Sequence, residues 1–125
     1  MIDKRRMGKN VAQAMNIIGN VEGKDCIIVD DMIDTAGTLI QACKALKENG
    51  AARVVACTTH PVFSPPAYER ISQADELDLV VATDTIPLNE ETKALDKVVV
   101  LSTAEILSKA IHRTFNNDSV SSLFV

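Results

Sequence analysis

The 125-residue sequence contains no tryptophan, and aromatic residues make up only 3% of it. Basic residues are outnumbered by acidic ones, 13 to 17, so no overall positive field indicates nucleic-acid binding. No apolar run approaches the roughly 20 residues that a membrane-spanning helix needs. We therefore predict that the protein binds neither nucleic acids nor membranes.

Cysteine is also scarce, with Cys26, Cys43 and Cys57 the only three. Their number is odd and their spacing fits no zinc pattern. All three lie in apolar stretches, which favours buried small side chains and predicts a reducing, cytoplasmic location. The remaining composition is 46% hydrophobic, which excludes disorder, and the length predicts one domain over residues 1–125.

Short apolar runs alternate with helical patterns along the chain. The predicted strands are Cys26–Val29, Val54–Cys57, Leu79–Ala82 and Val98–Leu101. Three helices are predicted. One begins near Thr38 and ends before Gly50, one covers Pro66–Ala74, and one follows Ser102. This order predicts an α/β fold, an open and mostly parallel sheet flanked by helices. The continuous run at Cys26–Val29 is typical of a strand covered on both faces.

Three segments give less regular signals. Ser102 and Glu105 have the spacing of a capping box, and the helix after them carries an apolar stripe of Ile106, Leu107, Ala110 and Ile111. Residues 11–25 are ambiguous between a helix face and other structure, with a turn predicted at Val21–Lys24. Residues 1–10 are charged and lack periodicity, so we expect a mobile arm.

An acidic and threonine-rich loop follows the first strand. Asp30 and Asp31 are expected at a strand end, where carboxylates can accept hydrogen bonds from sugar hydroxyls or bind Mg²⁺. The stretch Asp34–Thr38 then leads into a helix whose free N–H groups favour a phosphate. Such a loop predicts a sugar-phosphate site, and the alternative is a polar loop that merely caps the helix.

The ten residues Val29–Thr38 resemble the phosphoribosyl pyrophosphate-binding signature of type I phosphoribosyltransferase folds. Across the whole chain the resemblance is to the ribose-phosphate pyrophosphokinase family, as its C-terminal half. The segments that carry it are Asp3–Arg6, Ile28–Thr38, Thr59–Ser64, Thr85–Pro87 and Ser119–Phe124.

The resemblance implies transfer of diphosphate from Mg-ATP to the C1 hydroxyl of ribose 5-phosphate, for nucleotide biosynthesis. It implies that Lys4 and Arg6 are catalytic, on the arm formed by residues 1–10, and that Mg²⁺ is bound at Asp30 and Asp31. The ribose 5-phosphate-binding residues it implies are Arg6, Asp30, Asp31, Asp34, Thr35, Ala36, Gly37 and Thr38. Those implied for a regulatory phosphate or ADP site are Ser119, Ser121, Ser122 and Phe124. A homo-oligomer, dimeric or hexameric, is implied as well.

Two features depart from the family. Its ATP-binding half, which would precede Met1, is absent from this sequence, and Pro65 stands where the family has glycine. Three alternatives stay open: a phosphoribosyltransferase that consumes phosphoribosyl pyrophosphate, although no segment is spare for its nucleobase hood; a non-catalytic regulatory homologue; and, more distantly, a receiver domain. His60 is expected to have a structural role. For Asp84 and Thr85, which follow a predicted strand, two alternatives stay open: they line the sheet edge where the ligand binds, or they have no contact with it.

Overall fold

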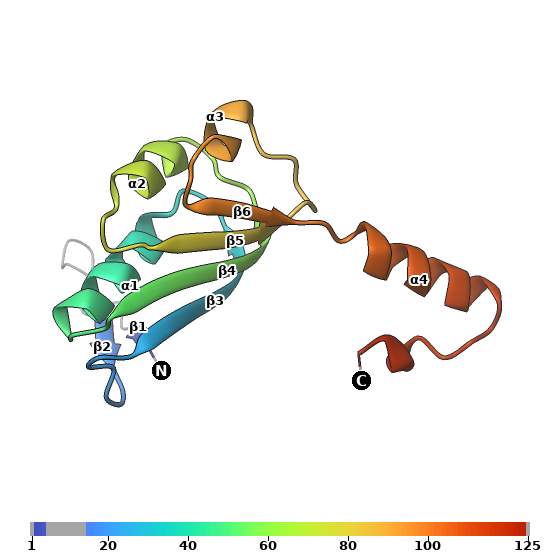
Figure 1. The fold of residues 1–125 in the computed structure, drawn as a ribbon, viewed down its shortest axis with the longest axis horizontal. Helices are drawn as coiled ribbons and strands as arrows, with labels where there is room; N and C mark the ends of the chain where they lie inside the picture. The colour runs from blue at the N-terminus through green and yellow to red at the C-terminus, as the bar shows by residue number, and fades with distance from the viewer. Residues whose placement is uncertain (1, 5–14, 125) are drawn as a thin grey trace.

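The computed structural model describes residues 2–4 and 15–124. Figure 1 shows a layer of helices on a twisted sheet, with the last helix projecting away from it. The elements in chain order are β1 (Ile2–Lys4), β2 (Met15–Ile17), β3 (Asp25–Ile33), α1 (Gly37–Glu48), β4 (Arg53–Pro61), α2 (Ala67–Gln73), β5 (Leu79–Thr83), α3 (Glu90–Lys93), β6 (Val98–Leu101), α4 (Ala104–Phe115) and the 3₁₀ turn η1 (Ser121–Leu123).

The main sheet has four parallel strands in the order β3-β4-β5-β6, which confirms the predicted α/β class. Strand β6 has its predicted bounds, but β3 and β4 run several residues past their apolar stretches. Ladder pairing between Met32 and His60 extends both strands through polar residues. Hydrogen bonding to a neighbouring strand therefore overrides the apolar pattern from which the strand ends were predicted.

The ambiguous segment contains a strand. In it, β2 pairs antiparallel with β1 in a separate two-stranded sheet, with Lys4 opposite Met15. The predicted turn at Val21–Lys24 is confirmed by the hydrogen bond that Lys24 N donates to the carbonyl of Val21 (3.1 Å). Helix α3 was not predicted; it is a single turn, and the side chain of Asn89 before it accepts a hydrogen bond from Thr92 N (2.8 Å).

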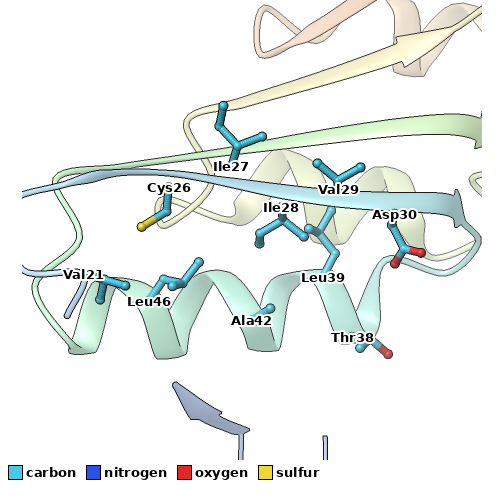
Figure 2. Close-up of a pocket in the computed structure, with 10 residues that line it drawn as sticks. All are labelled: Val21, Cys26, Ile27, Ile28, Val29, Asp30, Thr38, Leu39, Ala42 and Leu46. Atoms are coloured by element: carbon cyan, nitrogen blue, oxygen red, sulfur yellow. The ribbon is translucent and has the colours of Figure 1, made fainter. Parts of the chain in front are cut away.

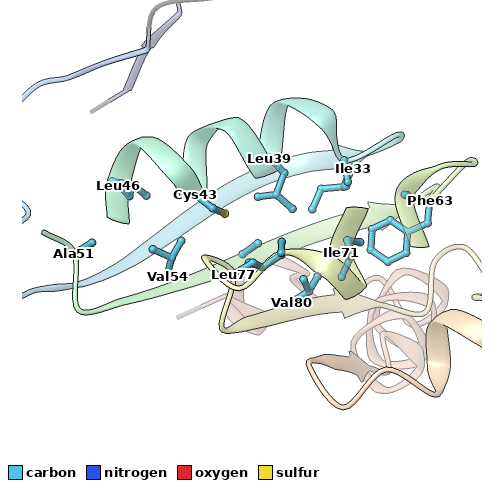
Figure 3. Close-up of a cluster of buried hydrophobic side chains, with 14 of the residues drawn as sticks. Ile33, Leu39, Cys43, Leu46, Ala51, Val54, Phe63, Ile71, Leu77 and Val80 are labelled. Carbon is cyan, nitrogen blue, oxygen red and sulfur yellow. The ribbon is translucent and has the colours of Figure 1, made fainter. Parts of the chain in front are cut away.

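The hydrophobic core lies between the sheet and the helices α1 and α2 (Figure 3). Helix α1 contributes Leu39, Cys43 and Leu46, four and three residues apart, so that they share one face. The predicted face of α2 is confirmed, since Ala67 and Ile71 are fully buried. From the strands come alternate residues such as Val54 and Val80, both fully buried.

The opposite face of the sheet is open among the described residues. Val29 on β3 is 79% exposed and Ile27 is 67% exposed. Register places Val29, Cys57, Val81 and Val99 in one row across all four strands of this face. The prediction that the first strand is covered on both faces is therefore wrong for this chain, where α1 and α2 cover one face only (Figure 1).

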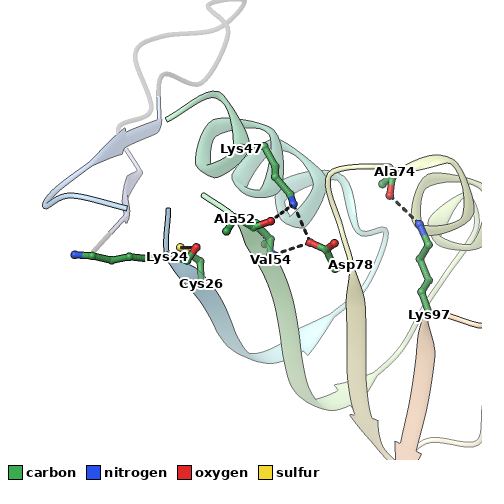
Figure 4. Close-up of polar contacts among 8 residues, drawn as sticks. All are labelled: Lys24, Cys26, Lys47, Ala52, Val54, Ala74, Asp78 and Lys97. Atoms are coloured by element: carbon green, nitrogen blue, oxygen red, sulfur yellow. Dashed lines mark hydrogen bonds and ion pairs between the residues drawn. The ribbon is translucent and has the colours of Figure 1, made fainter. Parts of the chain in front are cut away.

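Polar contacts tie the helices to the N-terminal ends of the strands (Figure 4). Lys47, in the last turn of α1, donates to the carbonyl of Ala52 (2.9 Å) and pairs with Asp78 (3.0 Å). The Asp78 carboxylate also accepts a hydrogen bond from Val54 N (2.7 Å), and this bond is the main reason that the pKa of Asp78 is lowered. These contacts fix α1 on the sheet at the end opposite to the acidic loop.

Helix α4 leaves the C-terminal end of β6 and points away from the sheet (Figure 1). Its predicted apolar stripe is largely exposed: Leu107 is 55% and Ile111 71% exposed. The predicted capping box is wrong. Glu105 pairs with Lys109, whereas the first turn is held by Asp84, which follows β5.

Within the described part of the chain, no helix is long and apolar enough to cross a membrane.

Candidate functional site

The two adjacent carboxylates of the acidic segment lie on a strand rather than in a loop. Because β3 extends to Ile33, Asp30 and Asp31 are consecutive strand residues and lie on opposite faces of the sheet. Figure 2 shows Asp30 directed toward α1 and Thr38, on the same side as Ile28, while Val29 points away. Asp31 is exposed. The two side chains therefore leave β3 in different directions, and the binding role predicted for Asp31 stays a prediction.

A tight turn connects β3 to α1. Ile33 is buried at the strand end, and the main chain then turns through Ala36, whose φ of 58° and ψ of 3° place it in the left-handed region. This conformation costs a non-glycine residue on the order of 1–2 kcal/mol, and such strain is concentrated at functional sites. Ala36 is only 4% exposed, so its methyl group is anchored in the core while its main chain lines the turn.

The start of α1 is left without a cap among the described residues. No side chain accepts from its first N–H groups, and its first turn contains no acidic residue. Ile40 N, donating to the carbonyl of Ala36 (3.0 Å), makes the first bond of the helix. Free N–H groups and the positive end of the helix dipole favour an anion at this position.

These parts enclose a small cavity of about 200 Å³. Its lining residues are Asp30, Met32, Ile33, Asp34, Thr35, Ala36, Gly37, Thr38 and Leu39. A larger cavity of about 510 Å³ lies between β3 and α1, is mainly apolar, and adjoins the small one at Asp30 and Thr38 (Figure 2). The structure thus brings together all the sugar-phosphate residues that the sequence predicted between 30 and 38, except Asp31.

Sequence reasoning missed Arg70, which comes from α2. Its Nη1 donates a hydrogen bond of 2.8 Å to the carbonyl of Thr35. No motif could have revealed this contact, because the two residues are 35 positions apart and only the packing of α2 beside α1 brings them together.

A second polar cluster lies at the ends of β4 and β5. The ring of His60 is 3.0 Å from the hydroxyl of Thr85, and that hydroxyl donates to the carbonyl of Thr59 (2.7 Å). Thr83 donates to the same carbonyl (2.6 Å). His60 therefore has a local partner, in keeping with the structural role predicted for it.

Asp84 joins β5 to the start of α4. It accepts hydrogen bonds from Ser102 Oγ (2.6 Å), Thr103 N (2.8 Å) and Thr103 Oγ1 (2.7 Å). The hydrogen bond from Ser102, followed by those from Thr103, lowers the pKa of Asp84 to about 2. Of the two readings of Asp84, the structure favours a structural clamp over a ligand contact.

Comparison with known proteins places this geometry in a family. Residues 5–125 match the phosphoribosyl synthetase-associated domain. The chain belongs to that family. It is 57% identical over 99% of its length to the ribose-phosphate pyrophosphokinase of Pasteurella multocida, and 56% identical over 99% to that of Haemophilus influenzae. In both cases it spans only 39% of the relative's length.

A solved structure supports the same assignment. The phosphoribosylpyrophosphate synthetase from Mycobacterium smegmatis superposes with a TM-score of 0.78 and 39% sequence identity, over 83% of this chain and 34% of that one. The parallel sheet with flanking helices is therefore the fold of a phosphoribosyl synthetase-associated domain.

No group of three or more potential metal ligands converges in the parts of this domain that the structure describes. Magnesium usually keeps several waters and binds one or two protein carboxylates together with substrate phosphates. Asp30, which lines the cavity, fits that role; Asp31, on the other face, does not join it.

The predicted catalytic arm lies largely outside the described residues. Arg6 falls in the undescribed range, and of Lys4 only the main chain is described, in β1. Their roles in this domain, and the mobility predicted for residues 1–10, stay predictions.

The predicted regulatory residues lie at the far end of the domain, beyond α4 (Figure 1). Arg113 organises them by donating to the carbonyl of Ser119 (2.8 Å) and to the hydroxyl of Ser122. The hydroxyls of Ser119 and Ser121 are 2.7 Å apart, and Phe124 is 72% exposed. The serines are thus gathered around one cation, whereas a regulatory function for them stays a prediction.

Proposed function

We propose that this chain forms the sugar-phosphate-binding part of a ribose-phosphate pyrophosphokinase, which transfers diphosphate from Mg-ATP to the C1 hydroxyl of ribose 5-phosphate. The observation that carries the proposal is the uncapped start of α1 directly after the strained turn at Ala36, with Asp30 lining the same cavity. The names of the relatives support it.

Each part of the cavity has a chemical task. The N–H groups of Gly37 and Thr38 and the hydroxyls of Thr35 and Thr38 can donate to the 5-phosphate. The Asp30 carboxylate accepts hydrogen bonds from the ribose hydroxyls and can ligate Mg²⁺, which when bound draws charge from the phosphoryl oxygens. In the sequence, Asp34 lies between Asp30, which is proposed to bind the ribose hydroxyls, and Thr35–Thr38, which are proposed to bind the phosphate.

Lys4 and Arg6 complete the proposal as the catalytic cations. Positive side chains near a phosphoryl group in transfer stabilise the charge that develops in the transition state. A guanidinium can bind two phosphate oxygens at once, whereas an ammonium acts as a point charge.

We further propose that the chain corresponds to the C-terminal half of the enzyme and acts with an ATP-binding half, in an oligomer. The order of the resembling segments supports this placement, and the shared lengths of 39% do not by themselves fix it. The 125-residue chain is accordingly expected to bind ribose 5-phosphate without making phosphoribosyl pyrophosphate. A regulatory homologue without turnover would behave in the same way, so adding the other half of a relative distinguishes the two.

The proposal is tested by calorimetry with ribose 5-phosphate. Thr38→Val removes one hydroxyl from the cavity, and Thr114→Val removes one from the exposed surface of α4, where it bonds the carbonyl of Ala110. Loss of a hydrogen bond to a charged group costs about 1.5–3 kcal/mol, so Thr38→Val should weaken binding roughly ten- to a hundred-fold. Thr114→Val should not change it. If the parent chain fails to bind, or if both variants bind like the parent, the site is wrongly assigned.

A further inference from the structure

The cavity at the start of α1 has an unfavourable charge for its proposed ligand. Among the described residues, its lining includes two carboxylates, Asp30 and Asp34, and no basic side chain. A sugar phosphate adds close to two further negative charges at neutral pH. The helix dipole contributes only about half a positive charge. A cation beside the turn, in addition to the Mg²⁺ and Arg6 of the proposed function, therefore strengthens phosphate binding at this site.

Arg70 is the basic side chain that the described structure places against this turn. Its Nη1 lies 2.8 Å from the carbonyl oxygen of Thr35, immediately before Ala36 and Gly37. Among the described residues this is the one hydrogen bond recorded for its guanidinium, which has five N–H donors in a planar fork. Donors therefore remain for a ligand oxygen at the same edge of the turn.

Gly37 makes this approach possible. A Cβ atom added there would lie 3.1 Å from Nη1 of Arg70, closer than ordinary van der Waals contact. The absence of a side chain at Gly37 thus accommodates the guanidinium.

The helix beneath Arg70 is well anchored. Its neighbour Ile71 is fully buried in the core, and so is Ala67 one turn earlier. The Cα position of Arg70 is therefore fixed by packing, even though its side chain is exposed. The packing of α2 therefore fixes the point from which the guanidinium reaches the Thr35 carbonyl, so this contact can keep the turn in one conformation.

We propose that Arg70 is a positioning residue for sugar-phosphate binding. It holds the Thr35 carbonyl, which fixes the turn that presents the first N–H groups of α1, and it adds a positive charge beside a cavity whose described lining is acidic. This inference rests on the proposed function. It adds a residue from outside the loop and predicts that binding depends on α2 as well as on the Asp30–Thr38 segment.

The test compares Arg70→Gln, Arg70→Lys and the control Arg53→Gln in the 125-residue chain. Arg53 is also exposed but lies at the start of β4, at the opposite end of the strands from the loop. Calorimetry with ribose 5-phosphate should show a roughly ten- to a hundred-fold weaker Kd for Arg70→Gln. Arg70→Lys should recover part of the loss, because it keeps the charge but not the fork. Arg53→Gln should match the parent.

A ligand-free measurement separates positioning from charge alone. The amide of Ile40 closes the first turn of α1 onto Ala36, so its hydrogen exchange reports whether the turn keeps its shape. Exchange at Ile40 should accelerate in Arg70→Gln and not in Arg53→Gln, with the same thermal unfolding midpoint for both.

The outcomes are distinct. A parent chain that does not bind ribose 5-phosphate overturns the proposed function and this inference with it. A parent that binds, with Arg70→Gln binding equally well, overturns the role of Arg70 alone. Weaker binding with unchanged exchange at Ile40 and full recovery in Arg70→Lys would show a charge effect only, and the positioning role would be wrong.

Discussion

The two faces of the sheet allow a prediction from one substitution made at two places. Val80 on β5 is fully buried against the helices, whereas Val29 on β3 is 79% exposed on the open face. Val→Ala removes two methylene equivalents, worth about 1.6 kcal/mol when fully buried. A cavity left behind raises the cost at Val80 to about 2–3 kcal/mol. At Val29 only about a fifth of the transfer term applies, so the cost there is about 0.3 kcal/mol.

Val29 lies on the edge strand β3 and Val80 on the inner strand β5, and strand preference can differ between such positions by about 1 kcal/mol. The expected difference of about 2 kcal/mol is larger than that. The assay is urea unfolding followed by circular dichroism, at two protein concentrations ten-fold apart. A free-energy loss at Val29→Ala comparable to that at Val80→Ala would refute the open face. If that loss also grew with protein concentration, the face would be covered by self-association in solution.

Three further predictions follow from individual side chains. Burial is the main cause that raises the pKa of Cys43 from 9.0 to about 11, which lowers its thiolate fraction about a hundred-fold at pH 8. Iodoacetamide should therefore modify Cys26 and Cys57 well before Cys43. Equal rates of modification by mass spectrometry would contradict this. The hydrogen bonds from Ser102 and Thr103 hold the pKa of Asp84 at about 2, below its ordinary 3.8. The clamp of Asp84 on α4 is therefore present above pH 3.8 and is lost as the pH falls through 2. The Thr103 amide resonance should titrate with a midpoint near 2, and a midpoint near 3.8 would show that the clamp is absent. When the rest of a relative is supplied, Lys4→Ala and Arg6→Ala should each lower turnover on the order of a hundred-fold with little change in ribose 5-phosphate affinity, and unchanged turnover in steady-state kinetics would remove both from the catalytic group.

Local sequence signals determined the fold class and the loop. Apolar runs of four residues identified all four strands of the main sheet, although one face of that sheet is open among the described residues. Gly50 marked the end of α1, and it has the positive φ of 85° that such a stop requires. The small and hydroxyl-bearing residues of Asp34–Thr38 predicted a turn into a helix, which is confirmed, whereas phosphate binding at that turn stays a prediction.

Long-range packing decided the rest. The separation of Asp30 from Asp31 depends on how far β3 pairs with β4, and that pairing is made by residues about 28 positions away. The clamp of Asp84 on α4 and the contact of Arg70 with Thr35 likewise join segments 19 and 35 residues apart. A one-dimensional pattern records which side chains follow one another, whereas the partners of these carboxylates and of this guanidinium are chosen by the tertiary arrangement of α2, β5 and α4 around the sheet.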